Sequence, residues 1–430
     1  MTPARETYPQ PLPQFLPFAP PLVGPEELRE IASTLESGWL TLGPKTEAFE
    51  KAMAAYLGAP ETLAVSSCTA ALHLVLRALE IGPGDAVITT PLTFVSTAHA
   101  ILYVGAYPLF VDIDSQLGNL SAAKVSAFLD KSARPGPDGR YVHRDSGKII
   151  KAILPVHYGG FPLDSTAFRE LALQRRLHIL EDAAHALGAQ RGNAKVGGQE
   201  LLAPLGEGLH ALSAFSFYAT KNLTTAEGGL LAGSPEILQK TRVLSSYGIS
   251  DSRRVWSRRH DPLGPPPPAW DYDVEALGFK NNFTDIQASM GLIQLKNFPL
   301  AQAKRERLAA IYERAFQSLG DLAILPQKEE DTIPSWHLYP LRLVPEKLAL
   351  SRDALKEKLL DLNIGTSVMF RPVHTFSFYR DFLKIPLGTY PEAERFFETT
   401  LSLPLSPKHS ESQIEEASHK IRALLLYYAR

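Results

Sequence analysis

Residues 213–229 read SAFSFYATKNLTTAEGG, an apolar strand that breaks into hydroxyl side chains, one lysine and two glycines. A lysine at the point where a buried strand ends loses contact with water, and this desolvation lowers its pKa. The neutral amine that results can form a Schiff base. Since most lysines after a strand are solvated surface residues, Lys221 needs support from elsewhere in the chain.

That support comes from residues 177–189, LHILEDAAHALGA, where an apolar strand ends on two carboxylates, small residues and a histidine. Open α/β sheets bind ligands where their strands end, which is the position of Asp182. A cofactor built on a protonated pyridine needs an anion at the ring nitrogen, so a lysine paired with an aspartate indicates pyridoxal phosphate. Taken alone, Asp182 could equally be a helix cap or the partner in an ion pair.

A third element is the stretch Ser66-Ser67-Cys68-Thr69-Ala70, between a predicted strand at 63–67 and a predicted helix at 70–79. Small and hydroxyl residues at a helix N-terminus leave N–H groups free at the positive end of the helix dipole, which suits a phosphate. An ordinary Ser/Thr cap is the alternative for this stretch in isolation. Lys221, Asp182 and this turn together predict a pyridoxal phosphate site.

Phe94 follows the predicted strand at 86–90 and could lie flat on an aromatic cofactor ring, although a core phenylalanine would fit the same position. The predicted strand-to-helix turns carry neither G-x-G-x-x-G nor G-x-x-x-x-G-K-[ST]. The sequence therefore argues against dinucleotide or Walker-type nucleotide binding.

The composition is that of an ordinary globular protein, with 45% hydrophobic and 21% charged residues among 430. The net charge of −2 provides no basic field, so we expect neither nucleic acid nor an anionic membrane as a partner. The start of the chain lacks the apolar core of a signal peptide, and a single cysteine, Cys68, fits a reducing compartment. We therefore expect a cytoplasmic protein, with no helix across a membrane.

The order of predicted elements indicates an α/β fold with a second, smaller unit. Strands and helices alternate up to residue 233, which predicts a mostly parallel central sheet with helices on both faces. We expect one helix to end at Pro299 and a second to follow at 300–319, with a domain boundary near 300. The predicted divisions are an extended proline-rich arm at 1–22, a large domain at 23–299, a small C-terminal α+β domain at 300–430, and surface loops at 134–147 and 252–271.

Several segments in this order resemble the DegT/DnrJ/EryC1/StrS aminotransferases, which are sugar aminotransferases of fold type I. The similar segments are Gly43-Pro44, Ser66-Ser67-Cys68-Thr69-Ala70-Ala71-Leu72-His73, Gly82-Pro83-Gly84-Asp85, Glu181-Asp182-Ala183-Ala184-His185-Ala186, Ser216-Phe217-Tyr218, Lys221-Asn222, Glu227-Gly228-Gly229 and Asn282-Phe283-Thr284-Asp285-Ile286-Gln287-Ala288. The resemblance extends from about residue 20 to residue 425.

The resemblance implies a role for each matching residue. Lys221 would hold pyridoxal phosphate and act as the base, and Asp182 would keep the ring nitrogen protonated. His185 would lie near the ring hydroxyl and Phe94 would stack on the ring. The residues implied at the phosphate are Thr69, Ser216 and the backbone near Cys68, together with Asn282 of a neighbouring subunit. The chain would thus form a homodimer with shared sites.

The resemblance also assigns Thr41 and His374 to the substrate side. It implies transfer of an amino group from an amino acid, expected to be glutamate, to a nucleotide-linked keto-sugar, with C4 as the expected position. Three positions differ from the usual family pattern. Cys68 replaces a glycine, so its side chain should point away from the phosphate; Met369 replaces a frequent histidine; and Ala226 precedes Glu227 where a glycine is usual.

Three other functions use the same fold. A related sugar dehydratase carries histidine where this chain has Lys221, which argues against that reaction. A non-catalytic regulator that binds pyridoxal phosphate would not require both Lys221 and Asp182, although it could retain them. A fold type I enzyme that acts on a small amino acid by elimination is the third alternative.

Overall fold

The computed structural model describes residues 7–136, 139–206, 208–250 and 272–430. The first six residues of the predicted arm and the whole of the predicted loop at 252–271 lie outside the described residues.

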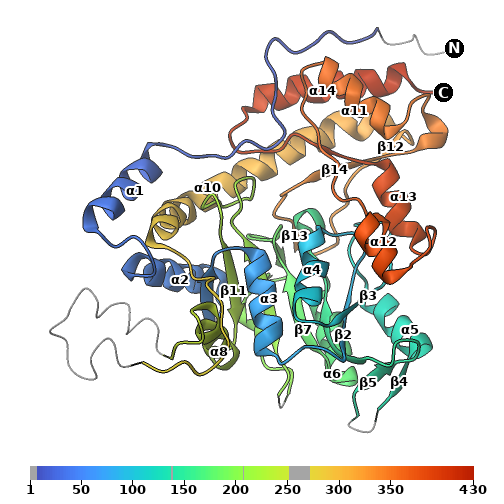
Figure 1. Ribbon diagram of the computed structural model, residues 1–430. Coiled ribbons are helices and arrows are strands. Elements are labelled where there is room, and N and C mark those ends of the chain that lie inside the picture. Colours follow the sequence, from blue (N-terminus) through green and yellow to red (C-terminus); the bar gives the residue numbers. More distant parts are fainter. Residues whose placement is uncertain (1–6, 137–138, 207, 251–271) are drawn as a thin grey trace.

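A central sheet, mostly parallel, forms the middle of the large unit (Figure 1). The strand order is β1-β11-β10-β7-β6-β2-β3, and only β11 runs antiparallel to its two neighbours. The strands of this path are β1 (Glu61–Val65), β2 (Asp85–Thr89), β3 (Tyr107–Phe110), β6 (Ile149–Leu154), β7 (His178–Asp182), β10 (Ala211–Ser216) and β11 (Gly229–Gly233). The parallel direction of β2, β6, β7 and β10 brings their carboxyl ends to one edge of the sheet.

Helices cover both faces of this sheet, because successive residues along the strands point to opposite sides and are buried on both. In β1, Leu63 and Val65 pack into one hydrophobic cluster with α3, α4 and α8, whereas Ala64 belongs to the cluster with α2 and α10. The helices on the two faces are α2 (Pro44–Leu57), α3 (Cys68–Ala78), α4 (Val95–Tyr103), α5 (Ala122–Ser132), α6 (Ser165–Arg175), α7 (Gln199–Leu202), α8 (Pro235–Ser245) and the first half of α10 (Asp285–Phe316).

The C-terminal unit is α+β, as predicted. Its antiparallel sheet, in the order β12-β14-β15, packs with the second half of α10 and with α11 and α14 around one apolar core. Its elements are β12 (Ala323–Ile324), β14 (Tyr339–Leu343), α11 (Arg352–Asp361), α12 (Ser377–Leu383), α13 (Pro391–Thr399), β15 (Thr400–Leu403) and α14 (Glu411–Tyr427). The two-unit α/β fold confirms the predicted fold class.

Helix α10 differs from the prediction, since it does not break at Pro299. It begins with a capping box at Thr284 and continues through the proline to Phe316. Phe298 is buried in the core of the large unit, and Leu308 and Tyr312 are buried in the core of the C-terminal unit. Burial on both sides of the proline outweighs the cost of about 3 kcal/mol of an interior proline. One helix therefore spans the position where the sequence suggested a boundary.

The N-terminal arm packs against the C-terminal unit before the chain reaches α1 (Pro25–Ser37) (Figure 1). Leu12 and Leu16 are buried in the C-terminal core, and their backbone amides donate to the carbonyls of Leu362 and Asn363 at 3.0 and 2.8 Å. The arm forms no helix or sheet of its own. It is held in place by these backbone hydrogen bonds and by the burial of its two leucines.

Part of the predicted loop at 134–147 is regular structure. Strands β4 (Ala133–Pro135) and β5 (Tyr141–His143) form an antiparallel pair, and β5 extends the central sheet beside β6. A short additional sheet joins the two units: β8 (Gln190–Arg191) pairs with β9 (Ala194–Lys195) and with β13 (Thr332–Ile333). These strands are only two or three residues long, so alternation of apolar and polar residues along them cannot distinguish them from loops.

Candidate active site

A cavity of about 500 Å³ lies where the strands β6, β7 and β10 end. It collects most of the predicted site residues from distant parts of the chain. Its lining residues are Ser67, Cys68, Thr69, Thr93, Phe94, Ser96, Val156, Asp182, Ala184, His185, Ser216, Tyr218, Thr220, Lys221, Glu227, Gly228, His337, Met369 and Phe370.

Lys221 lies in the turn that follows β10, and its backbone amide donates to the carbonyl of Tyr218 at 2.9 Å. Burial lowers the pKa of its amine to about 8, although the nearby Asp182 carboxylate opposes the shift. At pH 7 a pKa of about 8 corresponds to roughly one neutral amine in ten, a far larger share than for a solvated lysine.

Asp182 is the last residue of β7 and is held by two hydrogen bonds. The hydroxyl of Thr97 donates to Oδ2 at 2.7 Å, and the amide of Ala184 donates to Oδ1 at 3.1 Å. Burial raises the pKa of Asp182, while these two bonds and the nearby Lys221 lower it. The carboxylate is thus fixed in orientation and lacks bulk water, so a cation would stabilise its charged form.

His185 and His337 lie side by side in the cavity, with ring centroids 4.2 Å apart. The amide of Gly159 donates to Nδ1 of His185 at 3.2 Å, which places the proton of this ring on Nε2. Nδ1 of His337 lies 3.1 Å from Oδ1 of Asn222, whose Nδ2 donates to the carbonyl of Ser335 at 2.7 Å. Burial holds the pKa of both histidines well below the usual value, so both rings are neutral.

The N-terminus of α3 forms another wall. The Ser67 side chain caps the amide of Ala70 at 3.0 Å, and Ala71 donates to the carbonyl of Ser67. The amides of Cys68 and Thr69 have no acceptor within the helix, and they stand at the positive end of its dipole. The Cys68 thiol lies 3.7 Å from the carbonyl oxygen of Ala214, in β10, and burial raises its pKa.

Glycine is required beside this turn. A Cβ at Gly229, in β11, would lie 2.3 Å from the carbonyl carbon of Ser67 and 2.5 Å from the amide nitrogen of Cys68. Close approach of these two backbones therefore shapes the anion-binding turn, which explains the second glycine of the stretch at 213–229.

Aromatic and apolar side chains form the rim of the cavity. Phe94 is 59% exposed although it is a large apolar residue, and its ring lies 6.0 Å from that of Phe370. The backbone carbonyl of the neighbouring Met369 accepts a hydrogen bond from the hydroxyl of Tyr158. An exposed aromatic ring beside a cavity offers a surface for stacking.

Three of the predicted site residues do not line this cavity. Asn282 donates to the hydroxyl of Thr41 at 3.3 Å, so these two lie together outside it. His374 is fully buried, and its Nε2 lies 3.0 Å from Oε1 of Glu394. His374, which was expected on the substrate side, is thus enclosed in this chain by an acidic partner and the ring of Tyr390.

Sequence reasoning missed, among others, His337, which lines the cavity, and Thr97, which lies outside the lining but donates to Asp182. Thr97 follows Phe94 in a run of hydroxyl residues, but its partner Asp182 is 85 residues away. His337 lies two residues before β14, and a histidine next to a predicted strand was the available signal. Neither position has a local pattern that distinguishes it from an ordinary polar residue.

The described residues fit a phosphorylated pyridine aldehyde. An amine with a lowered pKa and a fixed carboxylate lie close enough to shift each other's pKa, and free amides stand beside them at α3. A carboxylate for a ring nitrogen, an amine for an aldehyde and a helix N-terminus for a phosphate are the requirements of pyridoxal phosphate. The fold and this site define a fold type I enzyme dependent on pyridoxal phosphate.

The chain belongs to the DegT/DnrJ/EryC1/StrS aminotransferase family, which it matches over residues 21–422. It is 40% identical over 413 residues to the spore coat polysaccharide biosynthesis protein SpsC of Bacillus subtilis, covering 96% of this chain and 97% of SpsC. The predicted family is thus confirmed, and with it the class of a sugar aminotransferase that uses pyridoxal phosphate.

Solved structures agree with this assignment. The putative sugar aminotransferase Spr1654 of Streptococcus pneumoniae, in its PMP-form, superposes with a TM-score of 0.80 at 28% identity, covering 95% of this chain and 98% of that one. DesV of S. venezuelae superposes with a TM-score of 0.79 at 31% identity, covering 95% and 99%. Within the part of the chain that the structure describes, we find no helix with the length and apolarity to cross a bilayer.

Proposed function

We propose that this enzyme transfers an amino group from an amino acid, glutamate, to the keto group of a nucleotide-linked sugar, at C4. The observation that carries the proposal is the meeting of Lys221 and Asp182 in one cavity beside the free amides of α3. SpsC, whose name links it to polysaccharide biosynthesis, supports a place in amino-sugar synthesis for a polysaccharide. The single cysteine supports action in the reducing cytoplasm.

When bound, pyridoxal phosphate supplies an aldehyde that condenses with amines and a protonated ring that accepts electrons. Lys221 is the residue that holds the aldehyde and the base that takes the proton from the carbon bearing the amino group. Its lowered pKa leaves a useful fraction of the amine free to accept that proton. Asp182, held by Thr97 and Ala184, keeps the ring nitrogen protonated.

The remaining side chains position the cofactor. Nε2–H of His185 is the donor for the ring hydroxyl, because Nδ1 already accepts from Gly159. The amides of Cys68 and Thr69, with the side chains of Thr69 and Ser216, hold the phosphate. The exposed ring of Phe94 would provide the stacking surface for the pyridine.

Asn282 and Thr41 support a homodimer with shared sites. They bond to each other outside the cavity of their own chain, which supports a role for them at the cavity of a second copy. In this arrangement Asn282 of the partner subunit reaches the phosphate and Thr41 of the partner subunit reaches the sugar. The dehydratase alternative finds no support here, because position 221 carries an amine rather than an imidazole.

The test is a direct assay of both half-reactions. Purified enzyme should be yellow, glutamate should bleach the visible band, and one member of a panel of nucleotide-linked 4-keto-sugars should restore it. We expect Lys221→Ala to lose turnover by several orders of magnitude, whereas Lys240→Ala, at an exposed lysine of α8, should retain it. A colourless protein, or full turnover in Lys221→Ala, would refute the proposal.

A further inference from the structure

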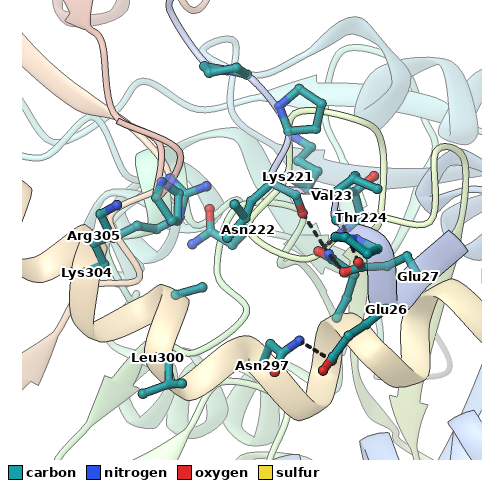
Figure 2. Close-up of a pocket in the computed structure, with 18 residues that line it drawn as sticks. Val23, Glu26, Glu27, Lys221, Asn222, Thr224, Asn297, Leu300, Lys304 and Arg305 are labelled. Carbon is teal, nitrogen blue, oxygen red and sulfur yellow. Dashed lines mark hydrogen bonds between the residues drawn. The ribbon is translucent and has the colours of Figure 1, made fainter. Parts of the chain in front are cut away.

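A second cavity, of about 440 Å³, lies between the N-terminal arm, the start of α1, the middle of α10 and the turn after Lys221 (Figure 2). Of the residues that the structure describes, Lys221 is the one that lines both cavities. The other lining residues are Pro20, Pro21, Leu22, Val23, Gly24, Pro25, Glu26, Glu27, Asn222, Thr224, Gln294, Asn297, Leu300, Ala301, Lys304, Arg305 and Pro407.

The charged side chains of this cavity are divided between two ends. Figure 2 shows Lys304 and Arg305 on one side and Glu26 and Glu27 on the other. Both carboxylates of the acidic end already have hydrogen-bond donors among the described residues. Glu27 accepts from Gln294 at 2.6 Å and from the amide of Gly24 at 2.9 Å, and Glu26 accepts from Asn297 at 3.2 Å and lies 3.5 Å from Lys296.

The basic end lacks such compensation. Arg305 is only 4% exposed, yet the described residues include no carboxylate paired with it. Its bonds are both from Nη1, at 3.0 Å to the carbonyl of Leu405 and at 3.4 Å to that of Trp336, and its buried Nε has no partner. A buried charge without a partner is costly, and a guanidinium edge matches an oxyanion with two parallel bonds.

Lys304 adds a second positive charge to the same end of the cavity. It is half-buried and, among the described residues, forms no ion pair, and its charge and that of Arg305 both lower the pKa of His409. Burial lowers the pKa of Arg305 to about 9, so the guanidinium is still a cation at neutral pH. The end of the cavity formed by Arg305 and Lys304 therefore carries positive charge that no carboxylate of the described residues pairs with.

We propose that this second cavity is a binding site for a small organic anion, whose carboxylate or phosphate group is held by Arg305 and Lys304. The volume exceeds what a bare anion fills, and the lining beside the two cations is apolar at Leu300, Ala301 and Pro407. The ligand is therefore an oxyanion carried on an apolar body. The second cavity shares Lys221 with the cofactor cavity, but Arg305 and Lys304 line the second cavity alone, and the proposal does not depend on the reaction assigned to the first.

The site is connected to the active site through the turn after Lys221. Asn222 lines the second cavity, and its Oδ1 lies 3.1 Å from Nδ1 of His337, which lines the first. The charge of Arg305 also lowers the pKa of His337. A bound anion that neutralises this charge therefore acts on the same histidine and the same turn that form the cofactor cavity.

The test is calorimetric titration of the cofactor-loaded enzyme, in which the cofactor's own phosphate already fills the turn at α3. Two probes are used, inorganic phosphate and glutarate, a dicarboxylate with no amino group to transfer. We expect at least one of them to bind with one site per chain. Tighter binding of phosphate assigns the site to phosphate monoesters, and tighter binding of glutarate assigns it to carboxylates.

Three variants locate the binding. Lys304→Ala should weaken it about tenfold and Arg305→Gln should abolish it, whereas Lys240→Ala, at an exposed lysine of α8 outside the lining, should leave it unchanged. Because Arg305 is buried and its variant can fail to fold, Lys304→Glu provides a second loss of binding at a half-buried position. Absence of binding of both probes, or binding that is equal in wild type, Lys304→Ala and Lys304→Glu, would overturn the proposal.

Discussion

The lowered pKa of Lys221 leads to a quantitative prediction for cofactor uptake. A shift from 10.5 to about 8 corresponds to about 3 kcal/mol at 1.36 kcal/mol per pKa unit. At pH 7 roughly one amine in ten is then neutral, compared with about one in three thousand for an unshifted lysine. Because only the neutral amine attacks an aldehyde, the burial of Lys221 should raise the uptake rate by about two orders of magnitude.

The assay mixes cofactor-free enzyme with pyridoxal phosphate and follows the visible band of the bound cofactor from about pH 6 to about pH 10. The rate should rise about tenfold per pH unit and level off near pH 8, where half of the amine is neutral. The same titration with Nα-acetyl-lysine, whose ε-amine is free, corrects the measured rates for the ionisation of pyridoxal phosphate itself. A rate that continues to rise up to about pH 10 would show that Lys221 is not desolvated and would refute the reasoning.

A variant without the Asp182 carboxylate tests the direction in which this charge shifts the pKa of Lys221. The Asp182 carboxylate raises the pKa of Lys221 and so opposes the effect of burial. Asp182→Asn removes this charge, so the midpoint of the uptake rate should move below pH 8. Movement of the midpoint above pH 8 would contradict the electrostatic coupling of the two residues.

Two further changes test the neighbours of this pair. Thr97→Val removes the 2.7 Å hydrogen bond to Oδ2 of Asp182, a bond to a charged group worth about 1.5–3 kcal/mol, so the cofactor should dissociate at least tenfold more readily in equilibrium dialysis. Thr97→Ser keeps the donor and should bind normally; equal affinities for the two variants would exclude this role. Asn282→Ala and Lys221→Ala should each be inactive alone, but co-expression should restore up to about a quarter of the activity, since mixed dimers contain one complete site. No recovery in mixed dimers would argue against shared sites.

Sequence reasoning predicted those parts of the site in which a strand meets its own loop. Asp182 and Ser216 end strands β7 and β10, and apolar runs followed by polar residues indicate such ends directly. The Ser/Thr-rich start of α3 was recognised in the same way, because a helix cap depends on neighbours within one turn.

Other parts depend on contacts across the chain that local patterns do not encode. His337 lies beside His185 although 152 residues separate them in the sequence, and His374 is enclosed by Glu394 rather than exposed. Pro299 predicted a helix end by its local chemistry, but burial on both sides of it keeps α10 continuous. In each case tertiary packing overrides the local signal.

The attachment of the N-terminal arm has a consequence for biosynthesis. Leu12 and Leu16 leave the ribosome early, yet the core that covers them includes Leu424 and Leu425, at the end of the chain. Contacts that join such distant segments form late, because the intervening loop must close first. Pro20–Glu27 also line the second cavity, so nascent or C-terminally truncated chains should lack that cavity even where the central sheet has already folded.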